Sequence, residues 1–264
     1  MIALDRHFVE KPWGRTDVPA AFGAPDGARI GEIWYGTGAH VQTSSAAFPV
    51  LVKWLFTSEK LSIQVHPSDA EAQAAGLKSG KEECWYIVDA PPGAVIGLGT
   101  VRPLSADELR AASLSGEIEA LMDWRPVKAG DYFYIPAGTV HAIGAGIILV
   151  EVQQYADITY RLYDYGRLDK GLARELHLDD AVAVAKAAPY ADPRSGQAMG
   201  NMQLAEGPYF GLWLVEDAAA LAAIPNDKPR WSVALAGEHF GQCALHLAGE
   251  TAPFSGRQLV AAAA

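Results

Sequence analysis

The sequence has 264 residues, of which 50% are hydrophobic and 20% charged, a balance that excludes disordered, collagen-like and disulfide-rich proteins. Its 31 acidic side chains outnumber 21 lysines and arginines, and the net charge of -10 would repel nucleic acid and anionic membranes. We therefore expect neither nucleic acid nor a membrane as partner. Two cysteines, no signal-peptide pattern in the first residues and no apolar run of membrane-spanning length predict a cytoplasmic protein.

Short runs rich in Val, Ile and aromatic residues, separated by glycine and proline, predict a mainly β protein with antiparallel strands. The expected strands cover residues 50–56, 61–65, 83–89, 94–98, 131–135, 147–153, 158–163, 209–215 and 231–236. Apolar and polar residues alternate through 61–66, which places Ser62, Gln64 and His66 on one face of their strand. A polar row of this kind is typical of a strand that lines a cavity.

Helices are expected to be few and short. Ser68 followed by Glu71 is a capping box that opens a helix reaching about residue 77. Ser105 with Glu108 repeats the pattern before a helix at 109–121, which Gly116 would divide. An alanine-rich stretch at 179–188 predicts a third helix.

Composition divides the chain into three parts. Residues 1–185 carry the chemistry-bearing motifs and predict a metal-binding catalytic domain, whereas 186–208 is rich in Pro, Gly and Asp and is typical of a linker. Residues 209–264 predict a smaller C-terminal β region, whose final alanines, 261–264, we expect to be frayed.

The most informative stretch runs from Gly130 to His141. It contains a turn glycine, a strand and a corner formed by Pro136 and Gly138, and the histidine begins the next strand. Proline removes a donor from the sheet and glycine permits a positive φ, so the corner can bend the sheet at a barrel rim. A histidine placed there can point into the mouth of a barrel.

Other metal-ligating side chains lie upstream of this histidine. Gln64 and His66 share the polar face of their strand, and Glu83 opens another strand. Together with His141 they form a nitrogen and oxygen donor set that suits Zn²⁺, while Fe²⁺, Mn²⁺ and Co²⁺ are also possible. Because the set lacks cysteine, we expect an open catalytic site. Neighbouring strand residues face opposite sides, so only one of Glu82 and Glu83 can point inward.

These motifs carry a family resemblance. Gly130 to His141 resembles the second cupin motif without its trailing asparagine, although Gln64 stands where the first cupin motif has a histidine. The segments 11–14, 31–34, 64–67, 80–86 and 158–161 are similar, in order, to type I mannose-6-phosphate isomerases of the short bacterial form. The resemblance extends to about Arg167 and fades after residue 185.

The resemblance implies both a fold and an activity. The fold would be a cupin-type antiparallel β-barrel, or jelly roll, with a few short helices and a second, smaller β region at the C-terminus. The activity would be a metal-dependent aldose–ketose isomerisation that interconverts mannose 6-phosphate and fructose 6-phosphate through a cis-enediol. The family's ligands for one zinc ion fall on Gln64, His66, Glu83 and His141.

The resemblance also assigns pocket residues. The family's active-site arginine falls on Arg161, and five other pocket positions fall on Lys53, Ser62, Lys81, Glu151 and Arg167. A basic cluster of Lys53, Arg161 and Arg167, with the Ser62 hydroxyl, would hold the anion of a sugar phosphate.

Proton handling has three candidates. Arg161 stays charged and would stabilise the enediolate, so Glu151, Lys81 or a water on the metal would move the proton.

Two other functions compete with sugar phosphate isomerisation. A cupin with two histidines and one glutamate can hold Fe²⁺ and activate dioxygen, although Gln64 and the basic residues of the pocket speak against this. A non-catalytic sugar-binding cupin, or an isomerase of a different sugar, is the other alternative, because the region after 185 lacks recognisable family motifs. Oxygen consumption, measured against sugar isomerisation, discriminates among these functions.

Overall fold

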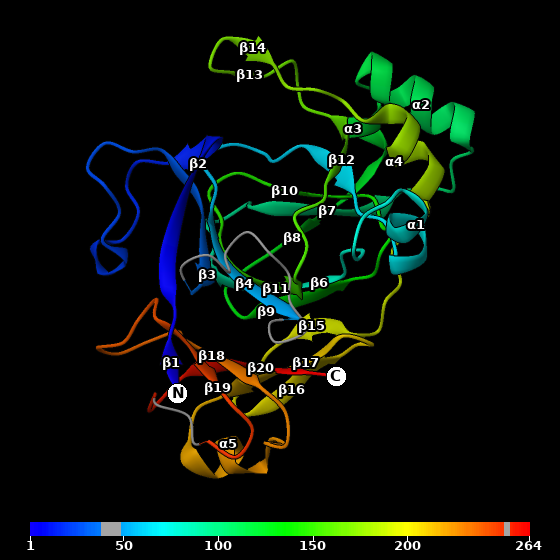
Figure 1. The fold of residues 1–264 in the computed structure, drawn as a ribbon. Coiled ribbons are helices and arrows are strands. Elements are labelled where there is room, and N and C mark those ends of the chain that lie inside the picture. Colours follow the sequence, from blue (N-terminus) through cyan, green and yellow to red (C-terminus); the bar gives the residue numbers. More distant parts are fainter. Residues whose placement is uncertain (38–48, 251–253) are drawn as a thin grey trace.

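Three antiparallel sheets stack as layers in the computed structural model, which describes residues 1–37, 49–250 and 254–264 (Figure 1). The central sheet has the order β15 (Ser195–Gln197), β9 (Asp131–Ile135), β6 (Glu83–Asp89), β11 (Ile148–Gln154), β4 (Val50–Phe56), β3 (Ile30–Gly36), β2 (Asp5–Arg15). A five-stranded sheet has the order β12 (Tyr160–Tyr163), β5 (Ile63–Val65), β10 (His141–Ile143), β7 (Val95–Thr100), β8 (Met122–Pro126). The expectation of a mainly β, antiparallel protein is confirmed.

A six-stranded sheet forms the third layer. Its order is β1 (Ile2–Ala3), β19 (Cys243–His246), β18 (Arg230–Ala234), β20 (Gln258–Ala263), β17 (Phe210–Val215), β16 (Met202–Glu206). A separate hairpin joins β13 (Leu168–Asp169) to β14 (Leu172–Ala173). Because β1 pairs with β19, the N-terminus is built into the C-terminal sheet.

Side-chain alternation gives the two faces of the central sheet different partners. On one face, Trp54 and its neighbours pack against the six-stranded sheet, where Trp231 belongs to the same buried cluster. On the other face, Trp85 packs with Ile96 and Ile143 of the five-stranded sheet. The polar residues described below share this second face, so the site lies between the central and five-stranded sheets.

Short helices cover the two outer layers. They are α1 (Asp69–Ala74), α2 (Ala106–Ser115), α3 (Ile118–Leu121), α4 (Leu178–Val184) and α5 (Ala218–Ala223), with a 3-10 turn at Ala20–Phe22. Leu109 of α2 and Ala181 of α4 pack with Ile63 on the outer side of the five-stranded sheet, whereas α5 packs on the six-stranded sheet. Within the described ranges, no helix is long and apolar enough to cross a membrane.

Local sequence patterns locate most elements correctly. The strands expected at 50–56, 83–89 and 131–135 have those bounds, and the other predicted strands appear within about two residues of theirs. Both predicted capping boxes are present, at Ser68 with Glu71 and at Ser105 with Glu108. Gly116 adopts a φ of 83° and separates α2 from α3, as expected.

The C-terminal part differs from two expectations. The predicted linker at 186–208 contains β15, which pairs with β9, and β16, which joins the six-stranded sheet. The expectation of a frayed C-terminus is wrong, because β20 lies between β17 and β18 and Ala261 pairs with Leu212 and Trp231. Backbone pairing on both sides orders this alanine-rich strand. The division into a domain at 1–185 and a region at 209–264 stays a prediction.

A substitution in β20 tests this placement. Leu259 is fully buried in the cluster shared by the central and six-stranded sheets, so Leu259→Ala should lower the free energy of unfolding by about 2–5 kcal/mol. Met199 is 82% exposed, and Met199→Ala should change it by less than about 0.5 kcal/mol. Urea denaturation measures both. Equal, small effects would contradict a structural role for β20.

Candidate functional site

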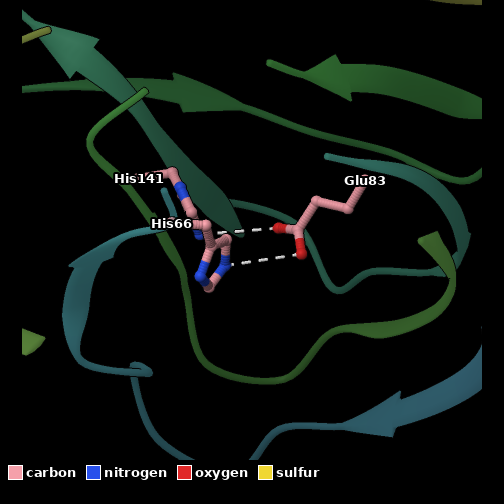
Figure 2. Close-up of side chains that lie close together, drawn as sticks. All are labelled: His66, Glu83 and His141. Atoms are coloured by element: carbon pink, nitrogen blue, oxygen red, sulfur yellow. Dashed lines mark ion pairs between the residues drawn. The ribbon is translucent and has the colours of Figure 1, made fainter. Parts of the chain in front are cut away.

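Three predicted metal ligands meet between the central and five-stranded sheets. His141 begins β10, Glu83 begins β6 and His66 follows β5, and Figure 2 shows both imidazoles facing the carboxylate. Their ligand atoms lie within 4.8 Å of one another, and all three side chains are buried. Glu83, and not Glu82, therefore points inward.

The fourth predicted ligand, Gln64, lies beside this group because of strand register. It is the direct partner of His141 in the pairing of β5 with β10. Its Nε2 is 3.3 Å from His141 Nε2, and its Oε1 accepts a hydrogen bond of 3.0 Å from Ser62 Oγ. An amide's oxygen and nitrogen exchange places on a half-turn, which would present Oε1 to the centre. Gln64 is thus placed to supply an oxygen.

The protonation states suit metal binding. His141 Nδ1 lies 2.8 Å from the Thr139 carbonyl oxygen, so Nδ1 carries the proton and Nε2 keeps its lone pair. Burial lowers the pKa of His141, and burial together with the Lys81 charge lowers the pKa of His66 to about 3. Burial opposes ionisation of Glu83, but the Lys81 ammonium outweighs it and holds the pKa of Glu83 well below its usual value. A metal ion is bound by neutral imidazoles and by ionised carboxylates, so all three side chains have the protonation state that a ligand requires.

An unsatisfied contact points to the same conclusion. Glu83 Oε1 lies 3.4 Å from His141 Nε2 and has no hydrogen-bond donor among the residues that the structure describes. Two buried lone pairs that face each other are unfavourable unless a cation lies between them. The donors are nitrogen and oxygen without thiolate, a chemistry that fits Zn²⁺ and related divalent ions. These residues therefore fit a divalent cation.

A cavity of about 250 Å³ adjoins the metal residues. Six predicted site residues line it: Lys53, Ser62, Gln64, Lys81, Glu151 and Arg161. It is also lined by polar and aromatic residues that the sequence analysis did not assign: Lys11, Trp13, Glu32, Asp157, Thr159 and Arg174.

Charges of opposite sign alternate along the cavity wall. Lys53 Nζ lies 3.8 Å from Glu32 Oε2 and 3.4 Å from Glu151 Oε1. Lys81 Nζ then lies 3.5 Å from Glu151 Oε1 and 2.6 Å from Glu83 Oε2. The register of β4 with β11 pairs Lys53 directly with Glu151 and so fixes the middle of this series. Each buried lysine is matched by carboxylates, as low-dielectric surroundings require.

The pKa values of Glu151 and Lys81 are shifted so that the two groups have different chemistry. Burial and the nearby Glu83 charge raise the pKa of Glu151 above its ordinary value. Burial opposes the charge on Lys81, but Glu151 and Glu83 outweigh it and raise its pKa. Lys81 is therefore a fixed ammonium, whereas Glu151 is a stronger base than an ordinary carboxylate. Trp85 Nε1 donates to Glu151 Oε2 at 3.2 Å and holds it in place.

The predicted arginines have different positions. Arg161 in β12 lines the cavity, and its Nη1 donates to the Glu175 carbonyl oxygen at 2.5 Å. Arg167 does not line the cavity and donates through Nη2 to the Lys60 carbonyl oxygen, so its predicted substrate contact stays a prediction. Arg174 lines the cavity instead. It lies in a segment without strand or helix periodicity, so no sequence signal pointed to it.

Comparison with known proteins gives concordant results, although no family model matches. Mannose-6-phosphate isomerase of Streptococcus mutans serotype c is 40% identical over 176 residues, covering 65% of this chain and 55% of the relative. Mannose-6-phosphate isomerase ManA of Bacillus subtilis is 43% identical over 161 residues, covering 60% and 51%. The chain thus spans about half the length of these two curated relatives.

Two further matches cover more of the chain. YvyI of Bacillus subtilis, a relative with the same family name, is 39% identical over 261 residues, covering 84% of this chain and 81% of its own. The solved mannose 6-phosphate isomerase of Bacillus subtilis has a TM-score of 0.81 at 28% identity, covering 99% and 98% of the two chains. The expected cupin-type fold is thereby confirmed. The chain belongs to the mannose-6-phosphate isomerase family.

Proposed function

We propose that this protein interconverts mannose 6-phosphate and fructose 6-phosphate. The observation that carries the proposal is a buried metal-ligand set beside a polar cavity in a chain of this family. Five cationic side chains line that cavity against three anionic ones, although the whole chain has a net charge of -10. A local positive excess in an acidic protein suits a substrate that carries a phosphate.

We propose zinc as the resident ion. Gln64, His66, Glu83 and His141 would hold it, and a solved mannose 6-phosphate isomerase with the same fold is described as bound with zinc and yttrium. When bound, the ion supplies a positive charge and Lewis acidity beside the sugar's oxygens.

Isomerisation transfers a proton between C1 and C2 of the open-chain sugar, and we assign this transfer to Glu151. The carboxylate lines the cavity, and two lysines and Trp85 fix its oxygens. A pKa raised toward neutrality favours a general base, which accepts the proton from one carbon and returns it to the other. Glu151 therefore fits the role better than Lys81, which stays protonated.

The cationic residues stabilise negative charge on oxygen. Lys81 holds its proton and can donate from Nζ to a sugar oxygen as charge develops there. Arg161 also stays charged, and we assign its guanidinium to the negative charge of the sugar's phosphate group. Lys53 contacts Glu151 and Ser62 contacts the Gln64 amide, so both lie beside groups that would take part in the reaction.

Metal dependence tests the proposal directly. Chelation should abolish the conversion of mannose 6-phosphate in a coupled assay, and Zn²⁺ should restore it without oxygen uptake. Glu83→Gln should lose both activity and bound zinc, because a neutral amide replaces the ionised ligand. Glu82→Gln is the matched control and should retain both, since Glu82 contacts Tyr134 outside the centre. Isomerisation that survives complete metal removal, or oxygen consumption instead of isomerisation, would refute the proposal.

The role of Glu151 has a separate signature. Glu151→Gln keeps the shape of the side chain but removes the base, so kcat should fall about 10²–10⁴-fold. Zinc content, measured by atomic emission, should be retained because Glu151 is not a ligand. An undiminished kcat would place the proton transfer on another group.

A further inference from the structure

The segment between β12 and α4 folds back onto the wall of the cavity. It carries the β13–β14 hairpin, which projects from the top of the molecule in Figure 1. At its base, His177 N donates to the Arg161 carbonyl oxygen at 2.9 Å, and Arg161 Nη1 donates to the Glu175 carbonyl oxygen. The returning chain is therefore tied to the strand that carries Arg161.

A second arginine is fixed at the same place. Arg174 Nη1 donates to both carboxylate oxygens of Asp164, at 3.2 and 3.1 Å. The side chain of Asp164 is 4% exposed and that of Arg174 is 14% exposed. Arg174 and Arg161 both line the cavity, so this contact across the base of the segment brings a second guanidinium to it.

Within the described ranges, neither guanidinium group pairs with a carboxylate that lines the cavity, since the Asp164 partner of Arg174 does not line it. Arg161 forms no ion pair among the described residues, and its Nε is buried without a hydrogen-bond partner. Arg174 is close enough that its charge adds to burial in lowering the pKa of Arg161. Two like charges at one cavity are unfavourable unless an anion lies between them.

The rest of the cavity is already neutralised. Lys53 and Lys81 each contact two glutamates, and Lys11 contacts Glu32 at 3.3 Å. Asp157, the remaining lining carboxylate, forms an ion pair with neither arginine within the described part of the chain. Of the described cationic groups of the cavity, Arg161 and Arg174 are therefore the ones that form no ion pair with a lining carboxylate.

We propose that Arg174 determines the specificity of the enzyme for phosphorylated sugars, by forming with Arg161 a two-guanidinium site for the phosphate group. This inference rests on the proposed function. Both contacts with Asp164 use Nη1, so Nη2 and Nε of Arg174 face no other partner in the described structure and are available to donate. Guanidinium groups match phosphate oxygens with paired, charge-assisted hydrogen bonds. Asp164 is then a positioning residue that orients Arg174.

The test compares Arg174→Gln with Arg110→Gln. Arg110 forms an exposed pair with Asp179 on the surface and is the matched control. The ratio of kcat/KM for mannose 6-phosphate to that for unphosphorylated mannose should fall about 10- to 100-fold in Arg174→Gln, mainly through KM, and stay constant in Arg110→Gln. Arg174→Lys keeps the positive charge but loses the paired N–H groups of the guanidinium. Its kcat/KM ratio should lie between those of the wild type and Arg174→Gln. An unaltered ratio in Arg174→Gln and Arg174→Lys would overturn the inference.

Binding of inorganic phosphate, measured by calorimetry, separates this inference from the proposed function. If the wild type isomerises neither sugar but binds phosphate, and Arg174→Gln weakens that binding about 10-fold or more, the proposed function fails and the anion site stands. If Arg174→Gln and Arg174→Lys bind phosphate as the wild type does, the anion site fails, whatever the activity. Thermal melting of each variant shows whether it is folded. If Arg174→Gln does not fold, phosphate binding by Arg174→Lys provides the test.

Discussion

The buried carboxylate of Glu83 is the constraint on which the site depends. An ionised carboxylate without water needs positive partners, and Lys81 at 2.6 Å supplies one of them. Burial keeps both imidazoles neutral, so they offer lone pairs instead of charge. A cation between His66, Glu83 and His141 would supply the remaining positive charge. Lys81 also contacts Glu151 at 3.5 Å and so links the metal residues to the cavity.

The central sheet accommodates these buried charged residues without loss of the apolar core. Its strands place large apolar side chains, such as Trp54, on the face that packs against the six-stranded sheet. The opposite face carries Glu83, Lys53 and Glu151, and cross-strand register pairs the last two directly. Because alternation assigns the two sets to different faces, the polar cavity does not interrupt the main core. The same seven strands thus supply both the apolar core and the polar residues of the site.

Local patterns in the sequence predict what depends on neighbouring residues. Alternation predicts that only one of Glu82 and Glu83 points inward, and the strand that Glu83 opens and the capping boxes follow from short-range alternation or spacing. Contacts between distant segments do not. Arg174 lines the cavity and donates to Asp164, ten residues earlier in the chain. β20 is ordered by pairing on both sides, although its alanines show no strand pattern. Arg167, which the family resemblance assigns to the pocket, donates to the Lys60 carbonyl oxygen, and its contact with substrate stays a prediction.

Anomalous diffraction at the zinc edge, from crystals of the zinc-loaded protein, tests the metal centre most directly. The account predicts one peak bounded by His66 Nε2, His141 Nε2 and a Glu83 oxygen, at about 2.0–2.2 Å from each, with the Gln64 amide turned to present its oxygen. A peak at another location, or none between these three side chains at full zinc loading, would contradict it.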